Sequence, residues 1–221
     1  MTTTKPFVIP EPKDLEEALK VARVQWLLSQ ASLANLAAEK LARDLTWADA
    51  DLEAQGVYHF TGIINDESVN YAIESLSRLA AYSKAPLTIR IMSPGGVVEE
   101  GLALYDFLIA LRSGGVDITT VGIGTAASMG GVLLQAGTKR LVSANASMLI
   151  HEVATGAIGK TSEVQDELNY AKSLQDRVLA ILAKRSTLPK REIAKRWQRK
   201  DWYLDAKEIV SLGFADGIGV R

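Results

Sequence analysis

The chain has 221 residues, 48% of them hydrophobic, so it is long enough to bury a sizeable core, and this composition excludes a disordered protein. Its 25 Lys and Arg residues balance 26 Asp and Glu residues and are interspersed with them, which argues against nucleic acid or a membrane surface as a partner. Cysteine is absent, which excludes disulfides and thiol chemistry, and no stretch resembles a secretion signal or reaches the roughly 18 apolar residues of a membrane span. We therefore expect a cytoplasmic protein.

The first predicted element is a long helix after a proline-rich lead. Apolar residues recur at helical spacing from Asp14, a suitable N-cap, to about Arg43, and a polar break follows. We therefore predict a helical N-terminal extension over residues 1–50 and a second domain over residues 51–221.

Strands and helices alternate in the second domain. This order predicts an α/β fold in which helical crossovers join parallel strands. Strands are predicted over residues 57–64, 87–92, 117–123, 140–144 and 147–151, helices over residues 68–82, 98–112, 162–185 and 190–199, with a short helix from Ser128 and a closing helix and strand over residues 206–220.

Two glycine-rich turns follow predicted strands, where ligands gather in open α/β sheets. The first, "IMSPGGVVEEG", contains Gly95 and Gly96, and the second, "GTAASMGG", places Ser128 and Met129 at the start of a helix. The free N–H groups at such helix starts can stabilise an oxyanion.

His151 ends the apolar strand "SMLIH", 23 positions after Ser128. A serine needs a base to become a nucleophile, and a histidine held by a carboxylate is the usual one. Taken singly, Ser128 is better explained as a helix N-cap and His151 as a strand-end residue without chemistry.

Together these motifs resemble the proteolytic subunit of the Clp protease, ClpP. "GTAASMGGVLLQAGTKR" and "ASMLIHE" are similar to the serine and histidine motifs of that family, and "IMSPGG" is similar to its oxyanion turn, over about residues 57–221. The resemblance implies a crotonase-like fold of repeated ββα units, a Ser-His-Asp triad, and a homo-oligomer, a tetradecamer of two stacked seven-membered rings around a closed chamber. It implies a hydrolase that acts on peptides or unfolded proteins without a metal or other cofactor.

The resemblance also assigns roles to residues of this sequence. It makes Ser128 the nucleophile, His151 the base, and Asp201 of "KDWYLDAKEIVSLGFADGI" the orienting carboxylate; Asp205 is a lesser candidate because it fits the cap of the last helix. The remaining implied positions are the oxyanion-hole amides of Gly96 and Met129 and the substrate-binding residues Gly95, Val97, Gly156 and Ile158.

The sequence departs from the family in two places. The N-terminal helix replaces the entrance region of the family, which argues against coupling to a Clp-type ATPase unfoldase; this helix either packs as a structural extension or narrows the entrance to the chamber. Glu152 stands where the family commonly has Gln. The helix over residues 162–185 occupies the position of the family's ring-joining handle.

Three alternatives remain open. A signal-peptide-peptidase-like enzyme of the same fold would use a Ser-Lys dyad with Lys139 or Lys160, against which the His151 and Asp201 matches argue. An acyl-CoA hydratase would use the oxyanion amides without needing the serine. A non-catalytic ring subunit would scaffold active paralogues although it keeps the triad residues.

Overall fold

The computed structural model describes Arg23 and residues 55–82 and 86–220. Apart from Arg23, the predicted helix over residues 14–43 lies outside the described residues, as does the domain boundary near residue 50, and both stay predictions. Among the described residues, no helix has the length and apolar character needed to cross a membrane.

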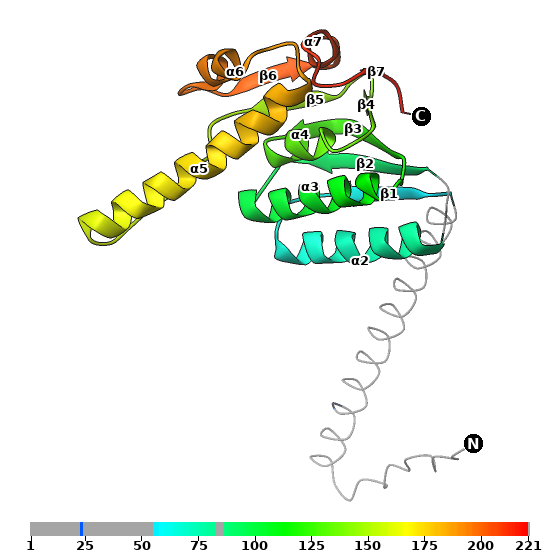
Figure 1. The fold of residues 1–221 in the computed structure, drawn as a ribbon, viewed down its shortest axis with the longest axis horizontal. Helices are drawn as coiled ribbons and strands as arrows, with labels where there is room; N and C mark the ends of the chain where they lie inside the picture. Colours follow the sequence, from blue (N-terminus) through cyan, green and yellow to red (C-terminus); the bar gives the residue numbers. More distant parts are fainter. Residues whose placement is uncertain (1–22, 24–54, 83–85, 221) are drawn as a thin grey trace, which may run out of the picture. The chain divides into compact units, whose positions relative to one another are not determined.

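A mostly parallel sheet organises the described residues (Figure 1) and confirms the predicted α/β fold. Its main path runs β1-β2-β3-β4-β7, with parallel neighbours throughout; β5 pairs in parallel with β3 and carries β6 antiparallel on its other edge. The strands are β1 (Val57–Thr61), β2 (Leu87–Ser93), β3 (Ile118–Ala127), β4 (Lys139–Val142), β5 (Ser147–Ile150), β6 (Trp202–Asp205) and β7 (Gly217–Ile218).

Helices cover the sheet and extend from it. Helices α2 and α3 lie side by side, and the second half of α5 packs on the domain while its first ten residues project away from it (Figure 1). The buried residues of α5 begin only at Ala171, so the projecting start has no core to cover. The helices are α2 (Asp66–Tyr82), α3 (Val98–Ser113), α4 (Met129–Leu134), α5 (Thr161–Arg185), α6 (Lys190–Trp197) and α7 (Ala206–Ser211).

Strand β3 changes partner along its length. Its first half pairs with β4, up to Gly122 opposite Val142, and its second half pairs with β5, from Thr125 opposite Ser147. Between the halves, Gly124 has a φ of 64°, a left-handed conformation that favours glycine. This bend explains why β3 runs on to Ala127, beyond the predicted end at residue 123.

The prediction missed β6, which lies at the edge of the sheet. Its four residues are too short a run for the period-2 pattern to be recognised, and Tyr203 is 66% exposed. Pairing with β5 makes it a strand, in the register Ile150 opposite Trp202.

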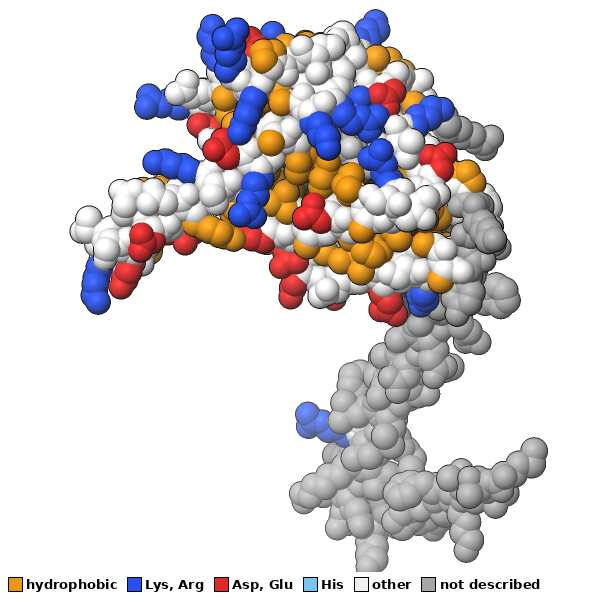
Figure 2. Space-filling view, in the orientation of Figure 1, with side chains coloured by type: hydrophobic (Ala, Val, Ile, Leu, Met, Phe, Trp, Pro, Cys, Tyr) orange, Lys and Arg blue, Asp and Glu red, His pale blue; other side chains and the backbone are white. Residues whose placement is uncertain are grey.

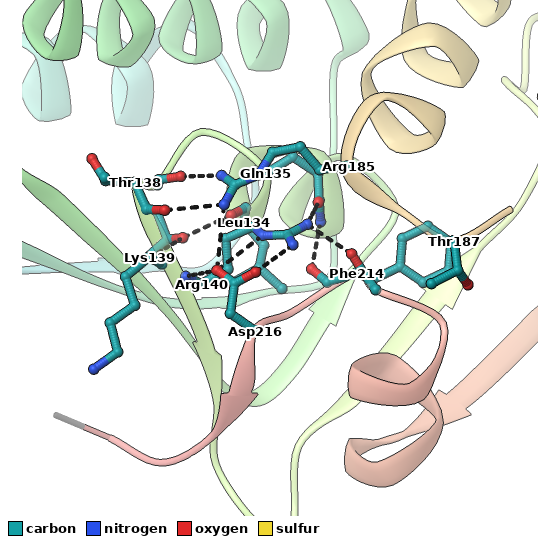
Figure 3. Close-up of polar contacts among 12 residues, drawn as sticks. Leu134, Gln135, Thr138, Lys139, Arg140, Arg185, Thr187, Phe214 and Asp216 are labelled. Carbon is teal, nitrogen blue, oxygen red and sulfur yellow. Dashed lines mark hydrogen bonds and ion pairs between the residues drawn. The ribbon is translucent and has the colours of Figure 1, made fainter. Parts of the chain in front are cut away.

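A saturated polar cluster ties α4, β4 and the C-terminal segment together (Figure 3). The guanidinium of Arg140, only 3% exposed, donates to Asp216 Oδ1 at 2.5 Å, to Gln135 Oε1 at 2.6 Å and to the Gly213 carbonyl at 2.8 Å. Arg185, at the end of α5, also donates to Asp216. We call Gln135, Arg140, Arg185 and Asp216 the Arg140 cluster.

The two arginines set the charge state of Asp216. Burial by itself would raise the pKa of this carboxyl, but the hydrogen bonds and charge of Arg140, aided by the charge of Arg185, outweigh burial and hold the pKa below its ordinary value. The cluster therefore contains a carboxylate that stays ionised under ordinary conditions.

Candidate active site

Ser128 stands at the sharp turn between β3 and α4. Its backbone has a φ of 53° and a ψ of -122°, a strained conformation for a residue other than glycine. Its N–H donates to the Leu149 carbonyl at 2.8 Å, which fixes the turn against β5. Its hydroxyl makes no capping hydrogen bond to α4, so the helix-cap explanation of this serine does not describe the structure.

The Pro-Gly-Gly turn after β2 packs directly on Ser128. A Cβ atom on Gly95, whose φ is 97°, would lie 2.6 Å from the Cβ of Ser128, so this contact requires glycine. A Cβ on Gly96 would lie 2.0 Å from the Ile64 carbonyl oxygen. The two glycines therefore bring the turn closer to Ile64 and to the serine than side chains would permit.

Two backbone N–H groups at this junction keep their hydrogen-bonding capacity. The bridge between Gly96 and Ile64 uses the Gly95 carbonyl and the Val97 N–H, at 2.9 Å each, and so bypasses the N–H of Gly96. Met129 is the first residue of α4, where an N–H has no partner within the helix. Among the described residues, neither N–H donates a hydrogen bond.

Ser93, which was not among the predicted site residues, links the two turns. This fully buried residue ends β2, and its Oγ accepts the N–H of Gly95 at 3.1 Å. A Cβ on Gly130 of α4 would lie 3.2 Å from the Ser93 Cβ. The buried alternation Leu87, Ile89, Ile91 along β2 continues to Ser93, and a polar residue in that register was the available signal.

The sheet brings His151 to the same edge as Ser128. Ala127 pairs with Leu149 in neighbouring parallel strands, so the residues that follow β3 and β5 emerge together. They share a cavity of about 100 Å³, which we call the serine cavity. It is lined by Gly96, Ser128, Met129 and His151, with apolar walls that include Val98, Val132, Ile150, Val178, Leu182 and Trp197.

The register of β5 and β6 brings Asp201 opposite His151. These strands are antiparallel with Ile150 opposite Trp202, so the next pair outward is His151 and Asp201. Both residues line a cleft of about 520 Å³ beside the serine cavity. Asp205 lies at the other end of β6, opposite Ser147, and its carboxylate caps α7 by accepting the Glu208 N–H at 2.9 Å.

Three contacts hold the segment around Asp201. The Trp202 ring packs edge-on against Phe214 with centroids 6.0 Å apart, and the Arg196 guanidinium lies 5.1 Å from the same ring. Glu152 accepts the backbone N–H of Arg199 at 2.9 Å, where Arg199 has a φ of 57°. The residue that departs from the family pattern thus joins the segment after His151 to the turn before Asp201.

The proposed catalytic side chains do not form hydrogen bonds with one another in this structure. Within residues 55–82 and 86–220, no hydrogen bond or ion pair involves the side chain of Ser128, His151 or Asp201. The structure therefore brings the three residues to one corner of the sheet and leaves their hydrogen-bonding groups open.

The substrate-binding residues expected from the resemblance lie in different settings. Gly95 contacts Ser128, and Val97 is 48% exposed on the wall of an adjoining groove. Gly156 has open space where a side chain would be, and Ile158 is fully exposed. Residues 151–158, which include both Gly156 and Ile158, form no strand in this structure.

Comparison with known protein families identifies the family of this chain. Residues 47–221 match the Clp protease family, and this match includes both glycine-rich turns, β5 with His151, and the segment that carries Asp201. It covers most of the chain. The chain therefore belongs to the Clp protease family.

Proposed function

We propose that this protein is a serine endopeptidase that cleaves peptide bonds of peptides or unfolded proteins. The observation that carries the proposal is the strand register. Ser128 follows β3, His151 follows its neighbour β5, and Asp201 precedes β6 directly across from His151. The unsatisfied N–H groups of Gly96 and Met129 adjoin the same cavity.

Each group has a defined chemical task. His151 takes the proton of the Ser128 hydroxyl as its oxygen attacks the peptide carbonyl, and the N–H groups of Gly96 and Met129 stabilise the resulting oxyanion. His151 then returns the proton to the leaving amine. Water then attacks the acyl carbon as it loses a proton to His151, and His151 gives that proton to the Ser128 oxygen as the acyl C–O bond breaks. Asp201 holds the imidazole in the required tautomer throughout.

The positions of the lysines argue against a Ser-Lys dyad. Lys139 begins β4 opposite Thr119, nine residues before Ser128 on the extended strand β3, or about 30 Å along it. Lys160 forms an ion pair with Glu163, 3.8 Å away, at the start of α5. Neither lysine is among the residues that line the serine cavity.

The same proposal includes assembly into two stacked seven-membered rings around a chamber. The projecting start of α5 exposes the apolar side chain of Leu168, which is 39% exposed and does not line the groove beside the serine cavity. A helix that presents apolar residues beyond the core of its own domain is suited to contact another subunit. This position along the chain is that of the family's handle helix.

A fluorophosphonate probe tests the chemistry, because it reacts with an activated serine. We expect the wild-type protein to be labelled and to hydrolyse a short fluorogenic peptide, and Ser128→Ala and His151→Ala to lose both properties. Native mass measurement should give the same ring mass for all three proteins. An assembled wild-type ring without labelling or hydrolysis would instead identify a non-catalytic scaffold subunit.

A further inference from the structure

A groove of about 480 Å³ lies between the start of α3 and the first half of α5. It shares Gly96, Val98, Val153 and Ala154 with the serine cavity, so it continues directly from the proposed reaction site. We call it the α3–α5 groove.

The walls of the groove are apolar with partly exposed surfaces. Ile63 is 59% exposed, Val97 48% and Tyr170 46%. Such walls suit the hydrocarbon stem of a long side chain, which loses contact with water when it lies along them.

The charged residues that line the groove are both acidic. Glu99 is exposed in the first turn of α3 and, among the described residues, forms no hydrogen bond or ion pair. Glu167, on α5, accepts the Thr155 hydroxyl with Oε1 at 3.2 Å and keeps its second oxygen open. An apolar side chain would strip water from these carboxylates without replacing it, whereas a cation would pair with them.

The helix starts beside the groove carry further acidic residues. Figure 2 shows acidic side chains over the starts of α2 and α3, and basic side chains over α6 and the end of α5. Residues 161–170 of α5 contain Glu163, Asp166 and Glu167 and no basic residue. The groove therefore lies in a negative field that attracts cations.

We propose that the α3–α5 groove binds a lysine or arginine side chain of the substrate, at a position near the cleaved bond. The proposal rests on the proposed peptidase function and specifies its substrates. An apolar substrate residue enters the serine cavity, and the basic side chain lies along the groove wall with its charge between Glu99 and Glu167.

The test uses internally quenched peptides that differ at one position. Lysine is placed in turn at each of the three positions on either side of a leucine, and each peptide is compared with one carrying norleucine, which has the same four-carbon stem without charge. Mass spectrometry of the products identifies the cleaved bond. We expect kcat/KM for lysine to exceed that for norleucine by about threefold to tenfold at one position, and this ratio to fall towards one at high salt.

Two variants separate charge recognition from general damage. In Glu99→Gln combined with Glu167→Gln, the lysine-to-norleucine ratio should fall to about one, while the amide oxygen introduced on α5 would still accept the Thr155 hydroxyl. Asp166→Asn removes an adjacent carboxylate of α5 that does not line the groove, and should lower the ratio far less than the double variant does.

Three results would overturn the proposal. The first is a ratio at or below one at every position while norleucine peptides are cleaved. The second is a lysine preference that persists in the double variant. The third, in which no peptide of either kind is hydrolysed, removes the peptidase function and this inference with it.

Discussion

Helix α4 has a polar site at each end, and the two sites differ in whether their polar side chains are hydrogen-bonded within the protein. At its C-terminal end, Gln135 belongs to the Arg140 cluster, where charged groups are paired and hydrogen-bonded within the protein. At its N-terminal end, the side chains of Ser128, His151 and Asp201 make no such bonds among the described residues. Groups that stabilise the fold are saturated by the protein, whereas groups proposed to react keep their capacity for a substrate.

Two substitutions of Ser128 separate its proposed role as nucleophile from the effect of its strained backbone on stability. Ser128→Ala and Ser128→Gly should each reduce peptide hydrolysis by at least about 10³-fold, because both remove the nucleophile. The glycine variant should unfold with a free energy about 1 kcal/mol higher than the alanine variant, because glycine adopts the φ of 53° without strain. Peptide assays and urea denaturation measure the two effects. Equal stability of the two variants would show that the turn stores no strain.

Asp201, which precedes β6, and Asp205, which ends it, should differ in their effects on activity and on stability. Asp201→Asn should lower kcat by about 10²-fold to 10⁴-fold through the wrong histidine tautomer, with little change in the unfolding free energy. Asp205→Ala should retain activity but lose about 1 kcal/mol of stability with the α7 cap. If Asp205→Ala instead inactivates a fully folded protein, the assignment of Asp201 is wrong.

Arg140→Met should lower stability and retain activity, whereas the Ser128 variants lose activity. Removing this guanidinium leaves Gln135 and Asp216 without their buried partner, and we expect a loss of about 3 kcal/mol in unfolding free energy. Activity per folded molecule should change little, because the cluster lies at the far end of α4 from Ser128. Lys195→Met, at an exposed position of α6, is a control for charge removal.

Glu152 forms a hydrogen bond within the protein but lies next to His151, whose side chain forms none among the described residues. Glu152→Ala removes the acceptor of the Arg199 N–H and should lower kcat by about tenfold, because the turn before Asp201 loses its anchor. Glu152→Gln keeps an acceptor oxygen and should retain most activity. Steady-state kinetics of both variants test this, and equal loss in both would assign the effect to charge.

The smallest expected effect is the pH dependence of the unfolding free energy that Asp216 contributes. The pKa of Asp216 is held below its ordinary value of 3.8, so the stabilisation by its charged form is complete above that value and is lost as pH falls through the lower folded-state pKa. The difference in unfolding free energy between the wild type and Asp216→Asn should therefore be larger at pH 6 than in acid. A difference that does not change with pH would contradict the pairing.

The sequence predicted the parts of the site that depend on local pattern. Glycine-rich turns and strand ends identified Gly96, Ser128 and His151, and the cap role of Asp205 was recognised from the helix that follows it. Asp201 came from family resemblance, because its relation to His151 depends on the pairing of β5 with β6, across 50 positions of sequence. The Ser93 contact and the Glu152 anchor also arise from tertiary packing, and no period along the chain encodes such contacts.

The change of partner at Gly124 divides the sheet into two arms. One arm continues through β4 and β7, and the other through β5 and β6, which carry the residues next to His151 and Asp201. Since few ladder hydrogen bonds are common to both arms, they can open separately. Native-state hydrogen exchange should therefore resolve two protected units, with amides of β5 and β6 exchanging through smaller openings than those of β2 and the first half of β3.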